Sequence, residues 1–380
     1  MAQEYDYIIC GAGLAGLSLA IRLSDSAYSD KRILILDKSN KKINDRTWSF
    51  WAHKDKLHFP SIVRKSWSNL AFYSPGHSIV TTPRNYQYHT ISGLDFYNYA
   101  FQQIEKAKHI QFVQTEISMI SENENAAVVE TTSGTFTGSI VFDSVVRSFP
   151  EKDPLFVWQH FLGWEVKLAK GSFDVDTATF MDFRIDQQGE TRFVYVLPYT
   201  SKTALVEATI FSKEIAEPHV YEEILKDYMK RYVSDDYEIE SEELGAIPMT
   251  TAPFGRSTDR IICIGTNNAT VKPSSGYAFM RIQEEIEKIM DLIDKGSVRP
   301  VKRSSKFLAY DKTLLNVLLT GKESGSSVFS MMFSRNTVDK ILKFLDEKTS
   351  LKEEVRIFST LPFWSFLRAF ARENVLRRTN

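Results

Sequence analysis

Apolar residues near the N-terminus follow the pattern of a buried strand, a helix and a second strand. Residues 5–10 (YDYIIC) form a short apolar run, which predicts a strand. Residues 14–23 (LAGLSLAIRL) carry apolar side chains at helical spacing, and residues 32–38 (RILILDK) form another apolar run. The order of strand, helix and strand predicts an α/β fold with a parallel sheet.

Three glycines join the first strand to the helix in the spacing G-x-G-x-x-G. Gly11 permits a tight turn, Gly13 lets the backbone approach a pyrophosphate, and Gly16 lets the helix pack closely on the strand. Asp37 ends the second strand, where it can accept hydrogen bonds from a ribose hydroxyl, and Lys38 beside it is a further candidate cofactor contact. An acid here favours an ADP moiety, as in FAD or NAD, over a 2′-phosphate. The alternative is a turn whose glycines serve only packing.

A similar arrangement recurs far along the chain. A strand at 260–264 is followed by Gly265, an irregular loop, Gly276 and a long helix. Such a segment can return to the first sheet and direct its helix N-terminus at another part of the same ligand. This organisation around one large cofactor favours FAD and predicts a discontinuous cofactor domain, and an ordinary strand-to-helix connection is the alternative. Flavoproteins of the hydroxylase type usually carry Gly-Asp at this point, whereas this chain has Gly265-Thr266.

The middle of the chain predicts an antiparallel sheet. Three apolar runs, at 177–185, 192–197 and 203–211, are separated by the short turns DQQGET and PYTSK. Connections of this length join neighbouring antiparallel strands. The last strand contains Glu207 among apolar residues, which is an uncommon place for a carboxylate.

The last eighty residues predict helices and a surface of interfacial character. Residues 300–348 alternate apolar and charged positions at helical spacing, after the linker 295–305 (KGSVRPVKRSS). Residues 355–380 are basic and rich in aromatic side chains, too short and too charged to span a bilayer, and they predict contact with a membrane surface. A C-terminal helix packed on the core is the alternative. The residues concerned are Phe358, Leu361, Phe363, Trp364, Phe366, Leu367 and Phe370, with Arg356, Arg368, Arg372, Arg377 and Arg378.

Composition narrows the class of protein. The 380 residues include 47 basic and 48 acidic side chains, so no overall field attracts nucleic acid, and we expect no nucleic-acid partner. Cys10 and Cys263 each lie in a run of β-branched residues. We expect them to be small buried side chains rather than a disulfide or a metal-binding pair. No apolar run reaches the roughly 18 residues of a spanning helix. A soluble or peripheral enzyme is expected.

Seven segments together resemble the lycopene cyclases of carotenoid synthesis, the bacterial beta-cyclase type and its plant relatives. They are GAGLAGLSLAIRL (11–23), NDRTWSFW (44–51), FMDFR (180–184), RFVYVLP (192–198), LVEATIFS (205–212), GAIPM (245–249) and VKPSSGYAF (271–279). The resemblance covers residues 5–285 and implies a reduced FAD used without net redox change, NAD(P)H as reductant, and lycopene as the substrate whose linear ends become beta rings. Where the family usually has Phe-Leu-Glu-Glu-Thr, this chain keeps one acid, Glu207, followed by Ala208; and it has Trp51 where bacterial relatives often have histidine.

The resemblance directs attention to two acids and a group of aromatic residues. Glu207 and Asp182 lie on nearby predicted strands, and we hypothesise that both point into an apolar cavity, where desolvation and repulsion leave one of them protonated. A protonated carboxyl could start cyclisation by adding a proton to the terminal double bond, and aromatic faces could stabilise the resulting cation. The alternatives are a structurally satisfied Glu207, and an Asp182 that pairs with a neighbour such as Arg184. Candidate substrate contacts are Trp48, Phe50, Trp51, Phe180 and Tyr277, for each of which core packing is the alternative.

The sequence therefore predicts an FAD-binding Rossmann-like fold of the glutathione-reductase type, with an antiparallel substrate domain and a helical C-terminal cap. The cofactor domain is assigned to 1–70, 95–150 and 245–300, the substrate domain to 71–94 and 151–244, and the cap to 301–380. We expect a lycopene beta-cyclase at the inner face of the cytoplasmic membrane. The rivals are a flavin monooxygenase or halogenase, although the halogenase motif Trp-x-Trp-x-Ile-Pro is absent, and a flavin-binding redox sensor or membrane module. The oligomeric state is left open.

Overall fold

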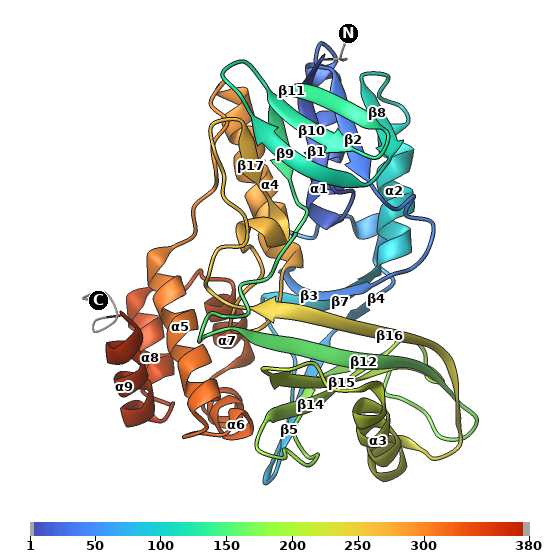
Figure 1. The fold of residues 1–380 in the computed structure, drawn as a ribbon. Helices are drawn as coiled ribbons and strands as arrows, with labels where there is room; N and C mark the ends of the chain where they lie inside the picture. The colour runs from blue at the N-terminus through green and yellow to red at the C-terminus, as the bar shows by residue number, and fades with distance from the viewer. Residues whose placement is uncertain (1–3, 375–380) are drawn as a thin grey trace.

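The computed structural model describes residues 4–374, in which two large sheets lie at opposite ends of the molecule and a helical lobe stands beside the second one (Figure 1). Within this range seven strands form the first sheet, in the order β8-β2-β1-β11-β10-β9, and β17 pairs with β11. Their bounds are β1 Glu4–Cys10, β2 Ile33–Asp37, β8 Ile110–Gln114, β9 Ile117–Glu122, β10 Ala127–Thr131, β11 Gly134–Asp143 and β17 Ile261–Cys263.

The first sheet confirms the predicted α/β cofactor fold. Strands β8, β2, β1, β11 and β17 run parallel, while β9 and β10 return antiparallel. One face is covered by the helices α1 (Leu14–Leu23), α2 (Gly93–Ile104) and α4 (Phe279–Asp294), whose apolar residues share one cluster with the strands. The late strand predicted at 260–264 is β17, and its pairing with β11 confirms that the chain returns to the first sheet.

The second sheet is the predicted antiparallel one, and it is larger than expected. Its order is β16-β12-β15-β14-β13-β5-β6, and the only parallel pair among these described strands is β13 with β5. The bounds are β5 Asn69–Ser74, β6 His77–Thr81, β12 Val157–Leu168, β13 Thr177–Asp182, β14 Thr191–Pro198, β15 Thr203–Ser212 and β16 Tyr237–Met249. Helix α3 (Pro218–Tyr228) packs on one face of the sheet. The opposite face packs against the helical lobe.

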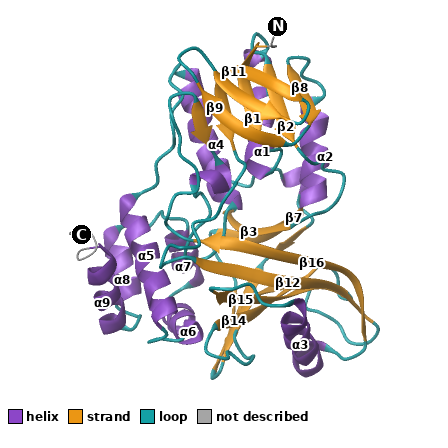
Figure 2. Cartoon of the chain, in the orientation of Figure 1, coloured by secondary structure: helices purple, strands orange, loops and turns teal. Residues whose placement is uncertain are grey.

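A three-stranded sheet lies between the two large ones (Figure 2). It consists of β3 (Thr47–His53), β4 (Lys65–Trp67) and β7 (Tyr86–Ser92). Strand β3 falls in the predicted cofactor domain and β7 in the predicted substrate domain, so their pairing links the two parts of the molecule instead of separating them near residue 70. Short 3₁₀ helices lie at Ser26–Tyr28, Pro60–Ile62 and Gly265–Asn268, and a turn of π-helix follows α3 at Met229–Val233.

Between residues 305 and 374 five helices form the C-terminal lobe, and the first three of them lie in the range 300–348, whose periodicity predicts helices. They are α5 (Ser305–Thr320), α6 (Gly325–Arg335), α7 (Val338–Leu345), α8 (Leu351–Phe358) and α9 (Phe363–Asn374). A buried ionic cluster ties the lobe to the loop before α4: Lys272 Nζ lies 2.8 Å from Asp311 Oδ1 and 3.1 Å from Glu347 Oε1. No helix between residues 4 and 374 combines the length and apolar character needed to cross a membrane. The predicted interfacial residues Arg377 and Arg378 lie outside the described residues.

Candidate active site

The glycine turn after β1 is held by contacts that leave no room for side chains at two of its three glycines. Gly11 has a φ of +96°, and a Cβ there would come within 2.3 Å of Ser144 Oγ. A Cβ on Gly16 would lie 1.9 Å from the carbonyl oxygen of Gly11, so α1 packs directly on the turn. Gly13 differs, because a Cβ on it would meet nothing within 4 Å, and it lies at the start of α1 on the wall of a cavity. This is the arrangement in which a helix N-terminus receives a phosphate.

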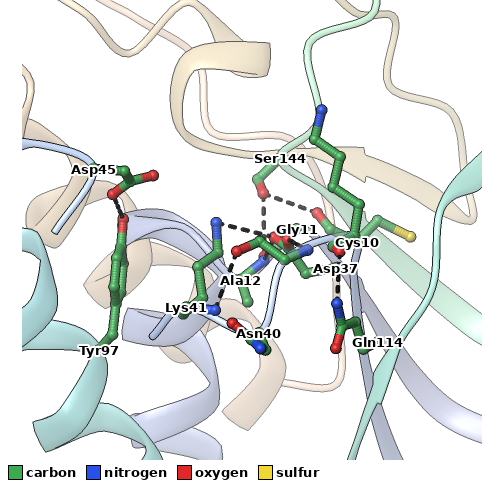
Figure 3. A network of polar contacts seen from close by, with 12 residues as sticks. Cys10, Gly11, Ala12, Asp37, Asn40, Lys41, Asp45, Tyr97, Gln114 and Ser144 are labelled. Carbon is green, nitrogen blue, oxygen red and sulfur yellow. Dashed lines mark hydrogen bonds and ion pairs between the residues drawn. The ribbon is translucent and has the colours of Figure 1, made fainter. Parts of the chain in front are cut away.

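Asp37 points at the same turn (Figure 3). One carboxylate oxygen accepts a hydrogen bond from the Ala12 amide at 2.6 Å, and the other accepts one from the Ser39 amide at 2.7 Å. Lys41 Nζ lies 3.4 Å from the same carboxylate. Asp37 therefore fixes the turn against the end of β2, and its contact with a ribose stays a prediction. The side chain of Lys38 is exposed to solvent, and Lys41 is the lysine that reaches Asp37.

The loop after β17 approaches the turn from the other side. Gly265 has a φ of +61°, and a Cβ on it would lie 2.6 Å from the Cβ of Ala15 in α1. Gly276, with a φ of +71°, sits where a Cβ would come within 2.1 Å of Gln159 Oε1 on β12. Both predicted glycines are thus required for close approach, and between them the loop connects the cofactor fold to the large antiparallel sheet.

A cavity of about 410 Å³ lies where these segments meet. Its wall includes Gly13, Leu14 and Ala15 from the turn and α1, Thr266 and Ser275 to Phe279 from the late loop, and Gln159, Tyr195, Leu205 and Glu207 from the second sheet. Two of its polar atoms, Gln159 Oε1 and Ser275 Oγ, are buried and have no hydrogen-bond partner within the described part of the chain. Buried polar atoms normally have partners, so this wall is suited to a polar ligand that supplies them.

Glu207 faces this cavity from the middle of β15. Within residues 4–374 its one hydrogen-bond donor is Thr209, whose Oγ1 lies 3.0 Å from Glu207 Oε1. Burial away from water and the nearby Glu243 raise the pKa of Glu207, the bond from Thr209 opposes both effects, and together they bring the pKa to about 8. The carboxyl is therefore mainly protonated at neutral pH. This agrees with the hypothesis that an acid of the apolar strand keeps its proton.

The second acid beside Glu207 is Glu243, which sequence reasoning did not select. Glu207 pairs with Gly163 on β12, and Gly163 pairs in turn with Glu243 on β16, so the two glutamates flank a glycine in one cross-strand row. The Thr47 amide donates a hydrogen bond to Glu243 Oε1 at 2.9 Å. Four of the six residues from 238 to 243 are acids, and nothing in their spacing selects one of them. Only the register of three strands distinguishes Glu243 from its neighbours.

Asp182 does not share the cavity, and the expectation that it would is wrong. A register shift lies between Thr179 and Asp182, so simple alternation along β13 fails and Phe180 and Asp182 face opposite sides of the sheet. Asp182 is aligned with Val194 and Ala208, on the face covered by α3, whereas Glu207 is aligned with Tyr195. Arg184 binds its carboxylate with Nη2–Oδ2 at 2.6 Å, and the Tyr228 hydroxyl donates to it at 2.8 Å. Asp182 is a satisfied structural ion pair, which was the stated alternative.

The predicted aromatic contacts divide into two groups. Trp48 and Tyr277 line the cavity. Phe50, Trp51 and Phe180 do not: Phe50 stacks on Phe279 with ring centres 4.0 Å apart, and Trp51 donates a hydrogen bond to Asp346 at 2.6 Å. Phe180 lies behind the wall, parallel to the Tyr277 ring at 5.9 Å. For these three the placement supports packing behind the cavity wall rather than direct contact with a ligand.

Two tyrosines that the sequence analysis did not select complete the wall. Tyr88 from β7 and Tyr195 from β14 line the cavity, and the Tyr277 hydroxyl lies 3.0 Å from that of Tyr88 and 3.5 Å from that of Tyr195. Burial raises the pKa of all three tyrosines, so they are neutral at physiological pH. The site thus combines a protonated carboxyl, aromatic faces and a glycine turn in one enclosure. It can donate a proton to an apolar ligand and stabilise positive charge that develops on it.

The raised pKa of Glu207 predicts a pH-dependent stability. The folded-state pKa of about 8 exceeds the ordinary value of 4.5, so the favourable contribution of the protonated carboxyl is complete below pH 4.5 and is lost as the pH rises toward 8. Glu207→Gln cannot ionise and escapes this loss. We expect the melting temperature of the wild type, relative to Glu207→Gln, to fall between pH 4.5 and 8 and then to level off. Glu242→Gln, at an exposed position of β16, is the control; parallel melting curves for the wild type and Glu207→Gln would contradict the assignment.

Comparison with solved structures identifies the architecture. The fold is similar to a geranylgeranyl bacteriochlorophyll reductase-like protein from Thermoplasma acidophilum, with a TM-score of 0.59, 12% identity, and 98% of this chain and 97% of the other covered. It is also similar to the halogenase PltM in complex with FAD, with a TM-score of 0.57, 14% identity, and 90% and 79% covered. At these identities the likeness shows the fold, which is that of FAD-dependent enzymes.

Comparison with known sequences identifies the family. The chain is 25% identical over 385 residues to a lycopene beta-cyclase from Pantoea ananas, covering 95% of this chain and 96% of that protein. It is 23% identical over 327 residues to a chloroplastic neoxanthin synthase from Solanum tuberosum, covering 80% of this chain and 64% of that longer protein. The model of the lycopene cyclase protein family matches residues 6–371. Its match to nearly the whole length, across both sheets and the helical lobe, shows that this chain belongs to the lycopene cyclase family.

Proposed function

We propose that the protein is an FAD-dependent lycopene beta-cyclase, which converts linear ends of lycopene into beta rings without net redox change. The observation that carries the proposal is Glu207, a carboxyl that keeps its proton at neutral pH while facing an aromatic-lined cavity beside the glycine turn. Family membership and the relatives with this name support the choice of substrate. An apolar polyene offers no acidic or basic group of its own, so the proton must come from the enzyme.

The residues of the cavity fit a flavin cofactor. Gly13 leaves open space at the N-terminus of α1 for the pyrophosphate, and Asp37 lies at the end of β2 where the ribose of such a cofactor binds. Gln159 and Ser275 present buried polar atoms that lack partners among the described residues. When bound and reduced, FAD would supply electron density that stabilises a nearby cation, and we propose NAD(P)H as the source of the electrons.

The reaction follows from the chemistry of the substrate and the position of Glu207. Glu207 transfers its proton to the terminal double bond, which leaves a tertiary carbocation. The electrons of an internal double bond attack this cation and close the six-membered ring. One proton then passes from the ring to the carboxylate that the first step left on Glu207, which forms the new double bond and restores the acid. One proton is gained and one is lost, so the product is an isomer. Tyr88, Tyr195 and Tyr277 present neutral aromatic walls to the cation and exclude water that would trap it.

A flavin monooxygenase acting on a lipid or aromatic substrate is the alternative, because halogenases and reductase-like flavoproteins share the fold. Such an enzyme would consume NAD(P)H and oxygen in proportion to product. It would have no need of a protonated carboxyl at the position of Glu207. The two functions therefore differ in stoichiometry and in product mass.

We further propose that the protein binds peripherally to a membrane, at the inner face of the cytoplasmic membrane, through α8 and α9. Six large apolar residues are exposed there, and Arg356, Arg368 and Arg372 are exposed around them. An apolar cavity of about 320 Å³ opens among the same helices and is lined by five of the six. The six are Leu351, Val355, Phe363, Trp364, Leu367 and Phe370. Aromatic and arginine side chains together favour the headgroup region of a bilayer, which is where a hydrocarbon substrate is dissolved.

Gly13→Val tests the cofactor. Because a Cβ at this position meets no protein atom within 4 Å, the variant should fold, and its side chain should obstruct the pyrophosphate. We expect the purified variant to have a near wild-type melting temperature before FAD is added and to lose most of its flavin absorbance. Full flavin absorbance in Gly13→Val would remove the glycine turn from the proposal.

Glu207→Gln tests the acid. Glutamine keeps the shape and the contact with Thr209 but has no proton of suitable acidity, so ring formation should fall by at least the roughly 10²- to 10⁴-fold typical of general acid catalysis. The assay uses lycopene and reduced flavin in parallel oxygen-free and aerobic reactions, and the wild-type product of both should have the mass of lycopene. Flavin content and melting temperature are measured on the same preparations. Wild-type turnover in Glu207→Gln would exclude this acid, and an oxygen-dependent product heavier by one oxygen would favour the monooxygenase.

The membrane contact is tested by removing apolar side chains from α9 without truncating the lobe, since Ile357, Leu361 and Ala369 of this region are buried. Phe363, Trp364 and Leu367 are 57, 67 and 45% exposed, so their replacement by serine should leave the fold intact. We expect the triple variant to bind anionic phospholipid vesicles at least tenfold more weakly than the wild type in a sedimentation assay. Serine at Ile43, Val80 and Met119, which are 69, 57 and 48% exposed elsewhere, forms the matched control. Equal loss in both triple variants would contradict a specific surface.

A further inference from the structure

We propose that Glu243 is a positioning residue that holds the catalytic proton on Glu207, through repulsion between two carboxyls that lie in one cross-strand row. This inference rests on the proposed function of Glu207 as the acid. Glu243 itself is not expected to touch the substrate, since it does not line the cavity. Its negative charge would make ionisation of Glu207 unfavourable. The proton would then stay on Glu207 until the double bond of the substrate lies in place to accept it.

The strand register brings the two acids together. In the row Glu243, Gly163, Glu207, three neighbouring strands place their side chains on one face. Gly163 has no side chain to separate the two carboxyls, and a Cβ there would lie 3.6 Å from Cβ and Cγ of Glu207 and 2.9 Å from Leu205 Cδ1. A larger residue at this point would stand between the acids. The glycine therefore allows two glutamates from β15 and β16 to interact across β12.

The surroundings decide which of the two acids keeps the proton. Burial raises the pKa of Glu243 as well, and Asp45 adds to this effect, whereas the backbone hydrogen bond from Thr47 at 2.9 Å and the attraction of Arg46 favour its charged form. Glu207 has only the Thr209 hydroxyl as a donor within the described residues. The charge of the pair is thus better accommodated on Glu243, and the proton stays on Glu207, at the cavity wall.

The other charged and titratable groups near Glu207 do not cancel this repulsion. Arg46 lines the cavity but is bound by Asp45, with Nε–Oδ1 at 3.2 Å and Nη2–Oδ2 at 3.0 Å. Further along the same face, Arg64 and Glu165 pair with each other. The remaining titratable groups facing this region are the tyrosines Tyr88, Tyr195, Tyr199 and Tyr277, which burial keeps neutral. Among the residues that the structure describes, Glu243 is the charged group left to act on Glu207.

The proposal is tested on the full-length protein by infrared difference spectroscopy of protonated carboxyls, as a function of pH. The band that is missing in Glu207→Gln reports the proton on Glu207. We expect its titration midpoint to move to lower pH by about 1 unit in Glu243→Gln, because a like charge in a medium of intermediate dielectric has been removed. Glutamine retains an acceptor for the Thr47 amide, so the local fold is maintained. Glu243→Asp keeps the charge and should restore most of the wild-type midpoint.

Glu242→Gln removes an equal charge from the adjacent, exposed position of β16 and should leave the midpoint unchanged. An unchanged midpoint in Glu243→Gln, or an equal shift in Glu242→Gln, overturns the proposal. In the cyclisation assay the alkaline limb of the pH profile should move with the infrared midpoint. Because the infrared measurement needs no turnover, absence of cyclase activity in the wild type would refute the proposed function while leaving the proton pair to be judged by its own titration.

Discussion

The parallel pairing of β17 with β11 determines where the active site of this protein can form. It returns the chain to the first sheet after the whole antiparallel sheet has been built, and it places the loop from Gly265 to Phe279 across the start of α1. The same loop contacts β12 through Gly276 and the helical lobe through Lys272. Three parts of the molecule therefore meet at one loop. The cavity lies at this junction, with the glycine turn on one wall and Glu207 on another.

Burial of the Glu207 carboxyl at this junction makes its ionised form unfavourable, and this keeps the carboxyl protonated. Desolvation disfavours the charged form of Glu207, and the only compensation from a described donor is one hydroxyl. A carboxyl in such a place is a poor contributor to stability at alkaline pH but a good source of a proton at neutral pH. Asp182 differs from Glu207 in this respect. It lies on the other face of the same sheet, where Arg184 and Tyr228 bind its fully buried carboxylate. The bulge in β13 therefore places Asp182, a structural carboxylate, on the face of the sheet opposite to Glu207.

The architecture shared with solved structures extends over most of the chain, and the candidate site is defined by particular side chains within it. The likeness to the reductase-like and halogenase structures covers 98% and 90% of this chain, so it includes the antiparallel sheet as well as the first sheet. The acids, the tyrosines and Gly163 come from the second sheet, the small sheet and the late loop. A fold that also occurs in a halogenase can therefore carry a site with a different proposed chemistry, because the chemistry depends on the side chains that line the cavity.

The sequence alone determined the local elements, since each depends on interactions between residues close in the chain. The glycine turn, the strand that ends at Asp37, the antiparallel strands and the C-terminal helices all follow from spacing and periodicity, and Glu207 was conspicuous within an apolar strand. The partner of Glu207 depended on tertiary structure, because the register of β15, β12 and β16 selects Glu243 from a run of acids. The bulge in β13 likewise reversed the side of Asp182. Packing against Phe279 removed Phe50 from the cavity wall, and packing against Tyr277 removed Trp51 and Phe180. Alternation in a strand predicts a face only while the hydrogen-bond ladder is regular, and contacts between distant strands are not encoded in the spacing of either one.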